Sequence, residues 1–146
     1  MAFTNPDDET LRALFRRVRT IAVVGFSPKP DRPSHTVAAA LQRFGYRIIP
    51  VRPMLAQGLG ETAYPDLAAI PDPGAIDLVD VFRAPEHVDE IVDACIALRI
   101  PAIWLQEGVV NEAAAERARA AGLTVVMDRC TYKEYLRHCR GGPRCE

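Results

Sequence analysis

The sequence predicts a doubly wound, Rossmann-like α/β domain with a parallel sheet of five strands in the order 3-2-1-4-5 and helices on both faces. Short apolar runs alternate along the chain with longer amphipathic patterns, as expected for right-handed βαβ crossovers. The strand runs are apolar throughout, which indicates a sheet covered on both faces. In this order the ligand crevice is expected at the carboxyl ends of the strands, between the first and fourth strands.

The first elements follow from their boundary residues. Residues 1–19 contain a helix, for which Asn5 is the expected amide N-cap. Residues 20–24, TIAVV, read as a buried strand. Ser34 is expected to cap the helix that follows the loop after this strand. Residues 46–51 then form the second strand.

The rest of the chain continues the alternation, apart from an irregular stretch after the second strand. Within that stretch only residues 64–70 suggest a short helical turn. The remaining expected elements are strand 77–82, helix 85–98, strand 102–105, helix 111–122, strand 123–127 and a last helix opened by a capping box at residues 131–134.

Length and charge limit the function. A chain of 146 residues with net charge −1 is expected to be one domain over residues 1–146, with a loose tail at residues 140–146. The charge balance argues against a nucleic-acid binder or a polybasic membrane surface. No apolar run approaches the ~18 to 20 residues that span a bilayer. We expect a cytoplasmic protein with a small molecule or a protein as partner.

The cysteines do not suggest a metal site. Cys95, Cys130, Cys139 and Cys145 match no zinc-ligand spacing. In a reducing compartment free thiols are expected. Cys95 is expected in the core, while Cys130 is open to two interpretations, a buried thiol or one that faces a ligand.

The loop after the first strand, GFSPKPDRPS at residues 25–34, is the main candidate for anion binding. Gly25 permits a sharp turn and close approach of a ligand, although a turn glycine also has purely structural uses. Ser34 would begin a helix whose free N–H groups favour an anion. Lys29 and Arg32 add two cations, which could equally be solvated loop charges.

Two arginines follow the second and third strands. Arg83 could pair with a phosphate, stack on a base or form an ion pair with Asp80 or Glu86. Arg52 stands where a domain that binds NAD normally has an acid for the ribose hydroxyls. A cation suits a ribose phosphate better, which favours NADP or coenzyme A.

Catalytic chemistry is poorly represented. Glu107 could act as a base, but no nucleophile or acid is placed beside it, and a structural role is the simpler interpretation. His35 and His87 have no expected partner. No G-x-S-x-G elbow, P-loop or H-E-x-x-H motif is present.

The chain resembles the small single-domain CoA-binding proteins of bacteria and archaea, which are similar to the N-terminal CoA-binding domain of the succinyl-CoA synthetase alpha subunit. The resemblance covers roughly residues 10–138. Its segments are IAVVGFSPKPDRPSHTVAAAL, YRIIPV, GETAYPDLAAIP, DLVDVFRAPEHVDEIV and WLQEGVVNEAAAERARAAGLTVVMDRC.

This resemblance implies coenzyme A as the ligand. The family commonly has PVNP after the second strand, where this chain has PVRP with Arg52. The implied site comprises Gly25, Phe26, Ser27, Lys29, Arg32 and Ser34 around the phosphates, Val51 and Arg52 beside the adenosine, Phe82 and Arg83 after the third strand, and Gln106, Glu107 and Gly108 across the cleft.

The resemblance also favours a binding module over an enzyme. The synthetase uses a second domain with a phosphorylated histidine and a beta subunit, and neither is expected here. We therefore predict a protein that holds or senses CoA or an acyl-CoA, with a homodimer or a separate enzyme as possible partners. The alternatives are an NADP-binding redox protein and a CoA-ligase-like subunit. If Cys130 faces the crevice, it could form a mixed disulfide with the CoA thiol.

Overall fold

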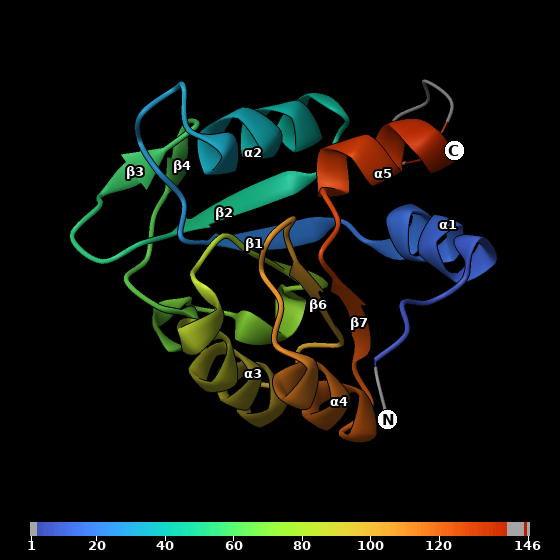
Figure 1. Cartoon of the computed structure of the whole chain (residues 1–146). Helices are drawn as coiled ribbons and strands as arrows, with labels where there is room; N and C mark the ends of the chain where they lie inside the picture. The colour runs from blue at the N-terminus through green and yellow to red at the C-terminus, as the bar shows by residue number, and fades with distance from the viewer. Residues whose placement is uncertain (1–2, 140–144, 146) are drawn as a thin grey trace.

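A single parallel sheet forms the middle layer of the computed structural model, which describes residues 3–139 and 145 (Figure 1). Its order is β2-β1-β5-β6-β7. The strands are β1 (Thr20–Val24), β2 (Arg47–Val51), β5 (Leu78–Val81), β6 (Ala102–Leu105) and β7 (Thr124–Met127).

Helices cover both faces of this sheet, as predicted. One face carries α1 (Asp8–Arg17), α2 (Pro33–Arg43) and α5 (Thr131–His138). The other carries α3 (Val88–Ala97), α4 (Glu112–Ala120) and the 3-10 turns η1 (Leu67–Ala69), η2 (Pro73–Ala75) and η3 (Pro85–His87). The expected fold class, a five-stranded Rossmann-like α/β domain, is therefore confirmed.

The position of one strand differs from the expected order. The third strand of the sheet along the chain, β5, was expected beyond β2, but it pairs with β1 on one side and β6 on the other. Counted along the chain, the five strands therefore lie in the order 2-1-3-4-5. The crevice moves with them, because the chain reverses its direction across the sheet between β1 and β5 rather than between the first and fourth strands.

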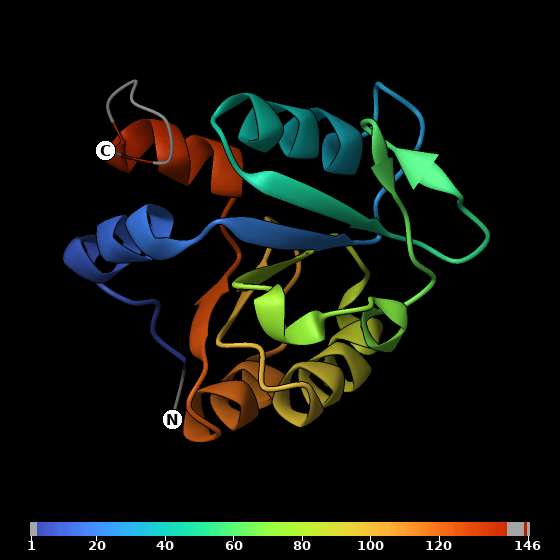
Figure 2. The ribbon, with the colours of Figure 1, turned by 180° about the vertical axis from the view of Figure 1, so that it is seen from behind.

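The connection from β2 to β5 gives the physical reason. Leu67 and Ile70 pack in the same core cluster as α3, and not in the cluster under α2. Figure 2 shows this connecting segment on the sheet face opposite α2. A right-handed crossover on the opposite face must run back across β1. Asp77, just before β5, then holds the start of β5 beside the start of β1, because its carboxylate accepts the N–H groups of Arg19 and Thr20, each at 2.9 Å.

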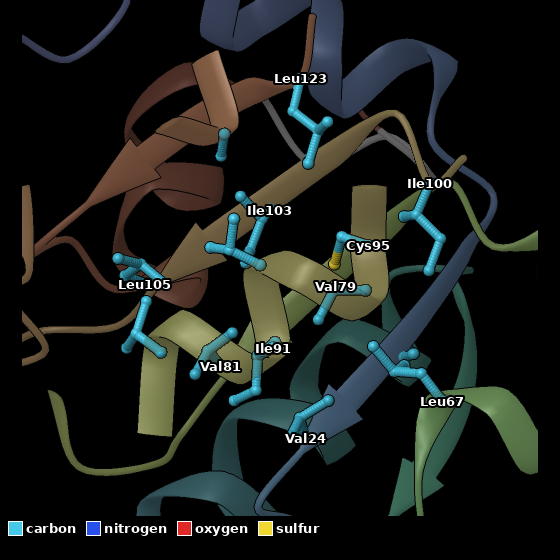
Figure 3. Close-up of a cluster of buried hydrophobic side chains, with 14 of the residues drawn as sticks. Val24, Leu67, Val79, Val81, Ile91, Cys95, Ile100, Ile103, Leu105 and Leu123 are labelled. Carbon is cyan, nitrogen blue, oxygen red and sulfur yellow. The ribbon is translucent and has the colours of Figure 1, made fainter. Parts of the chain in front are cut away.

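Two apolar clusters hold the layers together. In β1, Ala22 and Val24 belong to the cluster under α3 and α4, while Ile21 and Val23 belong to the one under α1, α2 and α5. Figure 3 shows the first cluster, where side chains of α3 interdigitate with those of β5 and β6. This two-sided burial is the reason that the strands contain no polar alternation.

The N-cap expected for the first helix is wrong. Asp7, not Asn5, is the N-cap of α1, and its side chain accepts the N–H of Thr10 at 2.9 Å. Asn5 instead pairs with the backbone of Met127, donating to its carbonyl at 2.9 Å and accepting its N–H at 2.8 Å.

The capping box expected for the last helix is absent. The N-cap of α5 is Cys130, which makes no side-chain capping bond. The Thr131 hydroxyl points to a buried carboxylate of β5 instead.

The cysteines only partly follow the prediction. Cys95 and Cys130 are free and buried, but Cys139 and Cys145 form a disulfide, so the expectation that all four are free is wrong. The loose tail predicted at residues 140–146 falls outside the described residues, apart from Cys145. Among the described residues, no helix has the length and apolar character needed to cross a bilayer.

Candidate functional site

The candidate site lies at the carboxyl ends of β1 and β5, which remain paired up to Val24 and Val81. Gly25 ends β1 with φ 89°, and a Cβ placed on it would lie 2.7 Å from the carbonyl oxygen of Phe82. The side chain of Arg83 also lies within 3.0 Å of that position. Gly25 is therefore required by the close approach of the segment after β5, whatever ligand binds above it.

The loop at residues 25–34 is held in shape by its own polar groups. Ser34 does not cap α2: the cap residue is Arg32, without a side-chain capping bond. The buried Ser34 hydroxyl instead accepts the N–H of Ser27 at 2.9 Å. Ser27 Oγ accepts the N–H of Lys29 at 3.2 Å. These two backbone donors are therefore not free for an anion, whereas the side-chain cations Lys29 and Arg32 of the same loop are exposed.

Phe26 is an anchor for the loop and is not accessible. It is fully buried beneath the hairpin of β3 (Gln57–Gly58) and β4 (Glu61–Thr62), which the sequence did not predict. A Cβ on Gly58 would meet the Phe26 ring at 2.5 Å. The ring of His35 lies 5.3 Å from the same ring, and its Nδ1 is 3.0 Å from the carbonyl of Ser27.

A polar hollow of about 470 Å³ lies beside this loop. Lys29, Arg32 and Arg52 are exposed cations on its wall. Arg52 lies against the loop, donating from Nη1 to the carbonyl of Phe26 at 3.4 Å. The other lining residues are Ser27, Pro33, Ser34, Phe82, Gln106, Glu107 and Val109.

Two more hollows extend the crevice across the edge of the sheet. A junction of about 370 Å³ is lined by Gly25, Arg52, Pro53 and Arg83. It shares Arg52 with the polar hollow, and its other three residues line a further hollow of about 460 Å³. That apolar hollow is also lined by Val24, Val51, Pro65, Asp66, Leu67, Ala68, Glu90, Ile91 and Ala94.

The two arginines therefore stand at the junction of a polar and an apolar hollow. Arg83 is half-buried, and within the described part of the chain it forms no ion pair with Asp80 or Glu86. The structural alternative considered for Arg83 is thus not observed. Val51 contributes to the apolar wall but is itself buried.

The floor of the polar hollow is a buried network that sequence reasoning missed. Gln106 Nε2 donates to Asp80 Oδ1 at 2.7 Å and to Thr131 Oγ1 at 2.9 Å. Thr131 Oγ1 donates to Asp80 Oδ2 at 2.9 Å. Burial raises the pKa of the Asp80 carboxyl to about 7, and its two hydrogen bonds oppose this shift. The one acid inside the apolar run LVDV was the signal that could have identified it.

The neighbouring predicted residues have local partners. Glu107 is paired with Lys133 at 3.1 Å. The Gly108 N–H donates to Asp128 Oδ1 at 2.8 Å. Both bonds hold the loop after β6 against the loop and helix that follow β7.

The histidine after β5 has a local partner, and no metal cluster is found among the described residues. His87 lies 3.4 Å from Glu90 at an exposed position, and the described residues contain no His, Cys, Asp and Glu cluster suited to a metal ion. Cys130 is buried in the cluster under α1, α2 and α5 and does not line any of the three hollows. The condition for a mixed disulfide, a thiol facing the crevice, is not met.

Comparison with known proteins gives related sequences and folds. Residues 19–135 match the family model described as a CoA binding domain. The uncharacterized protein YneT of Bacillus subtilis (strain 168) is 40% identical over 126 residues, covering 86% of this chain and 92% of that protein.

Solved structures agree with this relationship. A hypothetical protein from Pyrococcus horikoshii OT3 is 36% identical, with a TM-score of 0.85, over 94% of this chain and 98% of that one. The dinucleotide-forming acetyl-coenzyme A synthetase 1 of Ca. Korarchaeum cryptofilum, apo form, has a TM-score of 0.68 at 21% identity. The match covers 81% of this chain but 28% of the synthetase, and at 21% identity it shows a shared fold alone.

Proposed function

The chain belongs to the CoA binding domain family, and from this premise we propose that it binds coenzyme A or an acyl-CoA in the crevice along the carboxyl edge of its sheet. The observation that carries the proposal is the continuity of the three hollows, with Arg52 and Arg83 at their junction. An elongated ligand with a charged middle, one polar arm and one apolar ring matches this shape.

The chemistry of each hollow suggests how CoA would lie. Arg52 and Arg83 would hold phosphate oxygens, with Lys29 and Arg32 on the loop above them. The apolar hollow suits the adenine ring, because Leu67 and Ile91 offer flat apolar contact there.

The edge of the apolar hollow also suits adenine. The carboxylates of Asp66 and Glu90 lie there and can accept from the exocyclic amino group. The polar hollow, toward Gln106, Glu107 and Gly108, would receive the pantetheine arm.

The absence of an acid after β2 favours CoA or NADP over NAD. Arg52 follows the last residue of β2, where a ribose diol would need a carboxylate acceptor. NADP remains the second candidate on this observation. CoA is preferred because residues 19–135 match the family model described as a CoA binding domain, and the polar hollow offers room for an arm beyond the arginines.

We infer a binding role without catalysis, as a carrier or sensor of CoA in the cytoplasm. Within the described residues, the crevice offers exposed cations and the Gln106 amide but no paired nucleophile and base. A separate enzyme that takes the bound CoA, or a second copy of the chain, would be its protein partner.

Titration calorimetry at fixed salt tests this proposal with CoA, dephospho-CoA, NADP and NAD. We expect CoA to bind tightest, and Arg52→Ala to weaken it about tenfold or more because a charged hydrogen bond is lost. Arg47→Ala is the matched control, since Arg47 is an exposed arginine at the opposite end of β2. Binding of NADP or NAD without CoA would refute the proposal.

A further inference from the structure

The polar floor of the crevice has one side-chain oxygen with no partner. Both described side-chain bonds of Gln106 use Nε2, and its Oε1 accepts from none of the described residues. Gln106 is only 5% exposed, but its Oε1 atom is not fully buried. Because Gln106 lines the polar hollow, this oxygen is open to the hollow.

The orientation of this amide follows from donor counting. Above about pH 7 the Asp80 carboxyl is ionised and only accepts, and a hydroxyl has a single proton to donate. The proton of Thr131 goes to Asp80 Oδ2, so Asp80 Oδ1 and Thr131 Oγ1 both require donors from elsewhere. The two N–H groups of Gln106 supply them. Turning the amide over would bring an oxygen against a carboxylate oxygen.

We propose that Asp80 is a positioning residue that sets the Gln106 amide with its oxygen toward the crevice, so that the floor accepts an N–H or O–H group of the ligand. Asp80 is fully buried and does not line the hollow, so it acts only through Gln106. This inference rests on the proposed function, and it adds that the pantetheine arm, which carries amide N–H and hydroxyl groups, is recognised by a fixed acceptor.

A purely structural role makes different demands. A carboxylate buried beneath a helix is costly, and a neutral amide of the same shape would fill the site with less desolvation. A neutral group at position 80 could both donate and accept, so it would leave the direction of Gln106 unspecified. The acid is the residue type that makes the direction unique.

The first test observes Gln106 in the free protein by nitrogen–proton correlation NMR. The side-chain N–H pair of Gln106 should exchange slowly with solvent, and Asp80→Asn should make it exchange at least about tenfold faster as the amide turns outward. The side-chain amide of Gln42, which donates to the carbonyl of Leu59 at 2.9 Å, is the internal control. Unchanged exchange of the Gln106 pair in the folded variant would overturn the inference.

The second test compares three ligands: CoA, acetyl-CoA and adenosine 3′,5′-bisphosphate, which lacks the arm. Asp80→Asn should weaken CoA and acetyl-CoA about five- to tenfold, the effect of losing one hydrogen bond, and leave the bisphosphate unchanged. Equal weakening of all three would show a structural role and refute the inference. Weakening of CoA alone would identify the thiol as the donor and refute it also.

Asp93→Asn is the matched control, because it makes the same acid-to-amide change at an exposed residue of α3 that lines none of the three hollows. It should bind all three ligands like the unmodified chain. If the unmodified chain does not bind CoA, the proposed function is refuted. The NMR test still decides whether Asp80 orients Gln106.

Discussion

Replacing Asp80 by Asn should remove a large pH dependence of stability. The pKa of this carboxyl rises from 3.8 to about 7 on folding because burial disfavours its charge. The folded state therefore holds the proton more tightly than the unfolded state. The contribution of Asp80 to the free energy of unfolding is highest below about pH 4, falls as the pH rises from about 4 to 7, and is constant above that. The rise in pKa from 3.8 to about 7, at about 1.36 kcal/mol for each pH unit, corresponds to about 4 kcal/mol.

Urea denaturation at several pH values between 4 and 8 measures this difference. The free energy of unfolding of Asp80→Asn relative to the unmodified chain should increase by about 4 kcal/mol across the window, because the amide does not titrate. The other carboxylates titrate in both proteins and cancel in the difference. Parallel curves for the two proteins would refute the reasoning, since Asp80 would then ionise in the folded state as easily as in the unfolded one.

Three further predictions concern the loop, the turn and the thiols. Gly25→Ala should lower the free energy of unfolding by about 3 kcal/mol or more, because of its positive φ and a 2.7 Å clash with the Phe82 carbonyl oxygen. Gly122→Ala, with φ 99° and open space around it, should lower it by about 1 kcal/mol. Equal losses in urea titrations would contradict the role of the clash. Ser34→Ala should weaken CoA binding about fivefold in calorimetry, because the N–H of Ser27 loses its acceptor and the loop loosens; unaltered affinity would show that the loop keeps its shape without that bond. Cys95 should resist a thiol reagent until urea unfolds the chain, because burial raises its pKa to about 12, and rapid labelling in the native protein would contradict this.

The sequence predicted which cations gather at the carboxyl edge of the sheet better than it predicted their contacts. Lys29, Arg32 and Arg52 were identified from their places after strands, and the structure brings all three to one hollow. Ser34 was correctly placed near them but with the wrong role, since its hydroxyl holds the loop and does not cap the helix. The choice between these two bonds depends on the loop path, which local pattern does not encode.

Other features had weak local signals or none. The hairpin over Phe26 consists of two-residue strands, too short for a periodic pattern. The apolar hollow is lined by residues of the β2–β5 connection and of α3, which are separate segments of the chain. Asp80 stood out as an acid within an apolar strand, but its partners Gln106 and Thr131 follow from tertiary packing.

The sequence alone determined the alternation of strands and helices, the two-sided burial of the sheet and the family, because these depend on local periodicity and ordered motifs. The tertiary structure decided the place of β5 beside β1 and therefore where the crevice opens. The physical reason lies in the connection after β2: Leu67 and Ile70 bury their side chains on the face opposite α2, and right-handed crossover then sends the chain back across β1. The same step brings Arg83 over Gly25, beside Arg52.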